Sequence, residues 1–179
     1  MSKLRPLIFT ALFAALTAAG AMIRIPLPPS AFTLQFLCAA MSGVLLGPVY
    51  GPLSQLVYLA LGLLGLPVFA SGGGFTYVLQ PTFGFLLGAV AASWLIGRLC
   101  RGNSSPLRIA LACLAGLAAL YTVGVPYMAL LCRLYLQQTW TMGRLLAAAV
   151  LPFLPADMLK ILVCVLLAPR LSAYLGKIH

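Results

Sequence analysis

The chain has 179 residues, of which 63% are hydrophobic and only 7% are charged, whereas a soluble domain carries about 25% charged residues. This composition predicts an integral membrane protein that forms a single domain over residues 1–179, and it leaves no segment polar enough for a separate soluble domain. The net charge of +10 comes from basic residues spread along the chain, which argues against a nucleic-acid-binding patch.

Apolar stretches predict an all-α bundle of six transmembrane helices. They lie at residues 6–23, 34–47, 53–66, 82–98, 109–131 and 145–168. The second and third stretches are short for a membrane span, which needs about 20 residues. Between them, the sequence GPVYGP at 47–52 predicts a tight turn.

The first helix has a face of small residues. Alanines recur there at helical spacing, at Ala11, Ala14, Ala15, Ala18 and Ala19. Such a face lets another helix approach closely, either within the bundle or from a second membrane subunit, and the pattern alone does not separate the two. After this helix, Arg24 and a run of prolines over 26–29 predict an extended connection.

A glycine-rich segment at residues 65–84 contains three successive glycines, Gly72, Gly73 and Gly74. Glycine backbone allows a sharp path and lets N–H groups approach a ligand. The segment is nevertheless apolar, with Phe69, Phe75, Tyr77 and Leu79, so we predict a lid folded back over the bundle. Gln80 stands at the start of the next helix.

The distribution of basic residues predicts the orientation of the bundle. With six spans, one side of the membrane carries seven Lys and Arg: Lys3, Arg5, Arg98, Arg101, Arg108, Arg170 and Lys177. The other side carries three: Arg24, Arg133 and Arg144. Because cytoplasmic loops carry the excess of positive charge, we expect both termini in the cytoplasm, and the lid and the 132–144 loop outside.

The last apolar stretch contains Asp157, the only acidic residue of the chain, and Lys160 three positions later. This spacing places both side chains on one face of a helix. A charge within a membrane span costs about 2.5–3.5 kcal/mol, so it usually has a partner and a function. Asp157 and Lys160 either neutralise each other as a packing device, or form a substrate site that a ligand completes. We favour the substrate site.

Four segments resemble the BioY family, the biotin-binding S components of energy-coupling-factor (ECF) vitamin transporters. They are PLPPSAFTLQ at 26–35, the run from GPVYGP to SGGG at 47–74, QPTFGFLLG at 80–88 and FLPADMLK at 153–160. The likeness covers nearly the whole chain in order. It implies a multi-pass protein of the cytoplasmic membrane that captures biotin from outside, together with an ECF transmembrane coupling subunit and a pair of ABC ATPases.

The resemblance also implies roles for single residues. The alanines of the first helix are similar to the pattern with which S components meet their coupling subunit. Asp157 would accept from a ureido N–H of biotin and Lys160 would donate to the ureido carbonyl, while the glycines at 72–74 would hold the tail carboxylate. The reverse pose, with Lys160 on the carboxylate, stays open. The aromatic rings of the lid would cover the bicycle of biotin: Phe69, Phe75 and Tyr77. Some members have Asn near position 79, whereas this chain has Leu79 followed by Gln80. We expect both residues to contact biotin, with the ring contact carried over to Gln80.

Three alternative functions remain. An S component for thiamine or riboflavin is the nearest, although cationic thiamine would favour several acidic residues. A small intramembrane enzyme would need more acids or His ligands, and a channel would need a polar stripe across several spans. His179 is the only His, so we expect no metal, no cofactor bound by this chain and no enzymatic activity, with ATP hydrolysis in the partner subunits.

Overall fold

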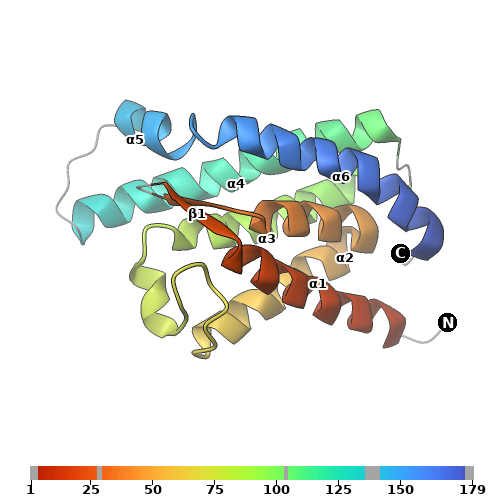
Figure 1. The fold of residues 1–179 in the computed structure, drawn as a ribbon, viewed down its shortest axis with the longest axis horizontal. Coiled ribbons are helices and arrows are strands. Elements are labelled where there is room, and N and C mark those ends of the chain that lie inside the picture. The colour runs from red at the N-terminus through yellow and green to blue at the C-terminus, as the bar shows by residue number, and fades with distance from the viewer. Residues whose placement is uncertain (1–3, 28–29, 103–104, 136–141, 176–179) are drawn as a thin grey trace.

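Apolar helices that satisfy their own backbone groups make up most of the computed structural model, which describes residues 4–27, 30–102, 105–135 and 142–175. Over these residues the helices pack side by side in one elongated bundle (Figure 1). They are α1 (Leu4–Met22), α2 (Gln35–Leu63), α3 (Phe83–Leu99), α4 (Pro106–Leu134), α5 (Met142–Ala149) and α6 (Leu154–Leu175). A 3-10 helix, η1 (Phe75–Leu79), lies between α2 and α3. The predicted helical architecture is therefore confirmed.

The two halves of α2 fold back on each other at Gly47. Gly47 has φ 76° and ψ −170°, a conformation that glycine adopts without strain, and Pro48 follows it without an N–H to donate. The Ser42 hydroxyl lies 3.5 Å from the carbonyl of Gly51, and Gln55 Nε2 lies 3.4 Å from the same hydroxyl. In a straight helix Ser42 and Gly51 would be roughly 13–14 Å apart, so the tight turn predicted at 47–52 is confirmed.

Close backbone approach places α3 between α2 and α4. A Cβ on Gly43 of α2 would stand 2.6 Å from the carbonyl oxygen of Ser93, and a Cβ on Gly88 of α3 would stand 2.6 Å from that of Leu120. Both contacts need glycine, as at close helix crossings in membranes. Buried Ser42 and Ser93 are also 2.9 Å apart at their hydroxyls, which joins α2 to α3 through a polar contact in the interior.

The connection after α1 is extended, as we expected, and its two strands pair as a hairpin. Strand β1 (Arg24–Leu27) pairs antiparallel with β2 (Ser30–Thr33), with Arg24 opposite Thr33. Directly after it, the Leu34 N–H donates to the carbonyl of Gly20 at 3.0 Å, so the hairpin returns to the end of α1. Proline keeps the backbone extended, but the prolines gave no sign of the pairing.

The last span is broken. Residues 150–153 form a turn between α5 and α6, and the two helices are bent by 51°. Pro152 and Pro155 account for the break, because neither can donate a helical hydrogen bond. Leu145 and Ala149 of α5 are buried against α4 near Met128. Asp157 therefore lies in the first turn of α6 rather than halfway along one straight helix.

Among the described residues, three helices are long and apolar enough to cross a membrane, α1, α2 and α4, and α5 with α6 adds a fourth if the bent pair is one span. Helix α3 is apolar but has 17 residues. The protein is thus a membrane protein, while six crossings stay a prediction. Helix α1 starts and α6 ends at the same end of the bundle (Figure 1). Lys3, Lys177 and residues 136–141, on which the orientation also depends, lie outside the described residues.

Candidate functional site

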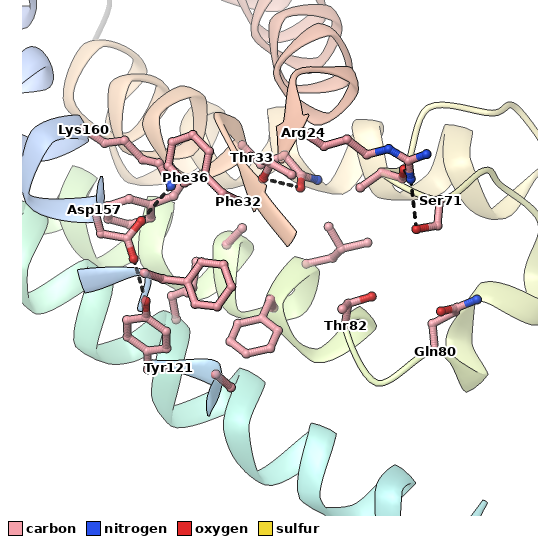
Figure 2. Close-up of a pocket in the computed structure, with 18 of the residues that line it drawn as sticks. Arg24, Phe32, Thr33, Phe36, Ser71, Gln80, Thr82, Tyr121, Asp157 and Lys160 are labelled. Carbon is pink, nitrogen blue, oxygen red and sulfur yellow. Dashed lines mark hydrogen bonds and ion pairs between the residues drawn. The ribbon is translucent and has the colours of Figure 1, made fainter. Parts of the chain in front are cut away.

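A cavity of about 270 Å³ lies among the helices, the hairpin and the glycine-rich segment (Figure 2). Its described lining has a charged group at one side, aromatic and aliphatic walls, and a second polar group at the other side. The lining residues are Arg24, Phe32, Thr33, Gln35, Phe36, Ala70, Ser71, Tyr77, Gln80, Thr82, Phe85, Leu86, Ala89, Leu120, Tyr121, Ala149, Phe153, Asp157 and Lys160.

The charged group is a buried ion pair. Lys160 Nζ donates to Asp157 Oδ1 at 2.7 Å, and the two residues are only 7% and 5% exposed. The hydroxyl of Tyr121 on α4 donates to Asp157 Oδ2 at 2.5 Å. The first turn of α6 adds the positive end of a helix dipole beside the carboxylate. One helical turn thus holds both ions on the cavity side, as the spacing predicted.

The ion pair keeps hydrogen-bonding capacity for a ligand. A carboxylate has about four acceptor positions and an ammonium group has three donors. Within the described part of the chain, Asp157 accepts two hydrogen bonds and Lys160 donates one. Lys160 Nζ also lies 4.3 Å from the centre of the Phe32 ring, which places an aromatic wall against the charge. A ligand with adjacent donor and acceptor groups can complete this set.

The walls between the two polar sides are apolar. Phe32 and Phe36 come from β2 and α2, Phe85 comes from α3, and Phe153 comes from the turn before α6. The rings of Phe85 and Tyr121 meet edge to face, with centroids 6.2 Å apart. Walls of this kind bury an apolar ring and exclude water, while a few polar groups fix its orientation.

The second polar side is built by the hairpin and the glycine-rich segment. Arg24 of β1 donates from Nη1 to the carbonyl of Ala70 and lies 3.4 Å from the Ser71 hydroxyl. Thr33 donates to Gln35 Oε1 at 2.8 Å, and these two residues also line the cavity. Figure 2 shows Arg24, Ser71, Thr82 and Gln80 across the cavity from Asp157 and Lys160.

Comparison with known proteins decides the family. The model of the BioY family matches residues 1–177. The chain belongs to the BioY family.

Members of the BioY family resemble the chain over nearly its whole length. A probable biotin transporter BioY from Lysinibacillus sphaericus is 42% identical, over 92% of this chain and 85% of the relative. The biotin transporter BioY from Thermotoga maritima is 35% identical, over 94% and 96%. The crystal structure of the S component for biotin from an ECF-type ABC transporter matches with a TM-score of 0.83 and 26% identity, covering 97% of this chain and 95% of that one.

The predicted BioY site residues fall into two groups. Asp157, Lys160, Gln80 and Tyr77 line the cavity. The other five are not among the described residues that line it: Phe69, Gly73, Gly74, Phe75 and Leu79. Sequence reasoning also missed lining residues, because an aromatic such as Tyr121 in an apolar helix resembles any lipid-facing residue.

Backbone hydrogen bonds within the protein fold the glycine-rich segment. The Gly74 N–H donates to the carbonyl of Gly62 at 2.7 Å, and the Gly72 N–H donates to that of Phe69 at 3.2 Å. Two of the three N–H groups expected to hold a carboxylate are thus already bonded to the protein. Phe69 is only 3% exposed and packs on Tyr77, whereas Phe75 is 78% exposed. The aromatic rings therefore do not act as one cover.

The alanines of α1 face two ways. Ala14 is buried and Ala18 packs partly buried against the same cluster of buried side chains. Ala11, Ala15 and Ala19 are exposed. The small-residue face is therefore split between a row that packs inside the bundle and a row, spaced by four residues, that is open to another helix.

Proposed function

We propose that this chain is the substrate-binding S component of an ECF-type biotin transporter, which captures biotin from outside the cell. Support comes from membership in the BioY family, and from relatives and a structural match whose names specify biotin. The cavity adds chemical support, because it joins a buried ion pair to apolar walls and a polar opposite side.

The ion pair carries the proposal. A ureido group offers N–H donors beside a carbonyl acceptor. The Asp157 carboxylate accepts from an N–H, and Lys160 donates to the carbonyl. The aromatic walls then bury the sulfur-containing ring, and the tail points toward Arg24. In the reverse pose the tail carboxylate would lie beside Asp157, and two adjacent carboxylates oppose each other's ionisation. We therefore place the ring at the ion pair.

The proposed topology follows the charge distribution. The chain crosses the cytoplasmic membrane six times with both termini in the cytoplasm, and the hairpin and glycine-rich lid face outside. Two short halves of α2 and the bent α5–α6 pair each contribute crossings, because protein rather than lipid can surround short helix ends. Biotin then enters the cavity from the lid side.

The proposed partners are an ECF transmembrane coupling subunit and a pair of ABC ATPases. Membrane lipid surrounds the rest of the bundle, and ATP is hydrolysed by the partners. The exposed row Ala11, Ala15 and Ala19 is the docking face for the coupling subunit, because small residues allow close helix approach in lipid. Ala14 and Ala18 support this face from within the bundle.

Equilibrium binding to the purified chain in detergent tests the function. We expect saturable binding of biotin by calorimetry, with thiamine and riboflavin unable to compete. Replacing Lys160 by Ala should weaken biotin binding by ten-fold or more, because a charge-assisted hydrogen bond contributes about 1.5–3 kcal/mol. Absence of biotin binding, or tighter binding of another vitamin, would refute the assignment.

A further inference from the structure

We propose that Arg24 forms a carboxylate subsite at the mouth of the cavity. It binds the ionised tail of the ligand and at the same time holds the turn at residues 70–71 beside the opening. The inference rests on the proposed function, since it assigns the second end of the same ligand. It moves the carboxylate from the three glycines, where we expected it, to a side chain.

The charge of Arg24 has no acidic side chain to pair with. Asp157 is the only acidic residue of the chain, and its carboxylate already accepts from Lys160 and Tyr121. The charged residues that line the cavity are therefore two cations and one anion. A ligand with a single negative charge balances the described lining, whereas a neutral or cationic ligand does not.

The Arg24 guanidinium has N–H donors beyond those used in its described contacts. Both of its described contacts, with the Ala70 carbonyl and the Ser71 hydroxyl, leave from Nη1. A guanidinium carries five N–H donors in a planar fork that matches the two oxygens of a carboxylate. Nε and Nη2 can therefore bind a carboxylate while Nη1 stays on the turn. Arg24 is exposed, so a tail bound there lies at the entrance and not in the buried part of the cavity.

Two segments far apart in sequence meet at Arg24. Its strand partner is Thr33 of β2, which also lines the cavity, and its side chain reaches 46 residues along the chain to Ala70. The hydrogen bond between Phe69 N–H and the Gly72 carbonyl, at 2.9 Å, closes the turn that Arg24 contacts. A carboxylate bound to the guanidinium therefore contacts Arg24, the residue that joins the hairpin to the turn. Such a contact opposes the separation of the hairpin from the turn.

Discrimination between an acid and its ester tests the subsite. We would measure the dissociation constants of biotin and of biotin methyl ester by calorimetry, for the unchanged chain, Arg24→Gln, Arg24→Lys and Arg133→Gln. Arg133 is an exposed arginine in the last turn of α4 that does not line the cavity, so its variant controls for net charge. The ester keeps the ring and removes only the negative charge.

We expect the unchanged chain and the Arg133 variant to prefer the acid by about 10- to 150-fold, which is the size of a charge-assisted hydrogen bond. Arg24→Gln should bind acid and ester alike, at the affinity that the unchanged chain has for the ester, and Arg24→Lys should keep part of the preference. Retained preference in Arg24→Gln, or equal loss of both ligands, overturns the subsite. Equal binding of both ligands by the unchanged chain overturns it too, but leaves biotin binding intact. Binding of neither ligand refutes the proposed function itself.

Discussion

Replacing Asp157 by Asn separates the two roles that a buried ion pair can have. The change keeps the shape of the side chain and one acceptor oxygen, but removes the charge that Lys160 and Tyr121 contact at 2.7 and 2.5 Å. Removing one partner of a buried pair destabilises a protein by about 3–5 kcal/mol. Since this pair faces a cavity, we expect the lower end of that range for folding.

The effect on binding differs from the effect on folding, because Lys160 lacks its anionic partner in the variant both with and without ligand. What binding loses is the charge on the acceptor of the ureido N–H. Hydrogen bonds to charged groups contribute about 1.5–3 kcal/mol, so we expect biotin affinity to fall by about 10- to 150-fold. Tyr121→Phe keeps the charge and should lower affinity by less than ten-fold.

The double variant Asp157→Asn with Lys160→Met is the decisive comparison. Replacing a buried pair by apolar groups is often neutral or stabilising, so thermal stability should recover relative to Asp157→Asn alone, while biotin binding should not. Biotin binding by calorimetry and thermal unfolding would be measured in one detergent for Asp157→Asn, Tyr121→Phe and the double variant. If Asp157→Asn lowered stability but bound biotin like the unchanged chain, the pair would be a packing device only.

Two further predictions concern the docking face and the glycine-rich segment. Ala15→Trp should abolish biotin uptake by cells that carry the coupling subunit and ATPases while leaving binding by the purified chain intact. Leu111→Trp, at an exposed leucine of α4, is the control, and equal loss of uptake in both would contradict a specific face. Gly62→Ala should lower the unfolding temperature and weaken biotin binding, because its Cβ would stand 2.1 Å from the ring of buried Phe69. Gly143→Ala meets open space and should change neither, so unchanged behaviour of the Gly62 variant would contradict the packing account.

How much of the fold follows from the sequence depends on local signals. The turn at Gly47 was predictable because glycine and proline together admit few other conformations. The break before α6 was not predicted, since the apolar stretch 145–168 indicated one helix, although Pro152 and Pro155 within it explain the break. The pairing of β1 with β2 was not predictable, because proline-rich segments specify extended backbone without specifying a partner strand.

The site residues also divide into those that the sequence could predict and those that it could not. Asp157 and Lys160 could be found because charge within an apolar stretch is rare, whereas Tyr121, 36 residues away, carries no such contrast with its neighbours. The N–H groups of Gly72 and Gly74 already close turns within the protein, a tertiary arrangement that the run of three glycines does not specify. Arg24 was interpreted as a residue of the extended connection and as a basic residue outside the membrane, since its reach to Ala70 is a tertiary contact.

A crystal structure of the chain with biotin bound would test the central claim most directly. We predict that the ureido N–H and carbonyl lie within hydrogen-bonding distance of the Asp157 carboxylate and of Lys160 Nζ, with the tail directed toward the hairpin. Biotin bound elsewhere, with Asp157 and Lys160 contacting only each other and Tyr121, would contradict the account.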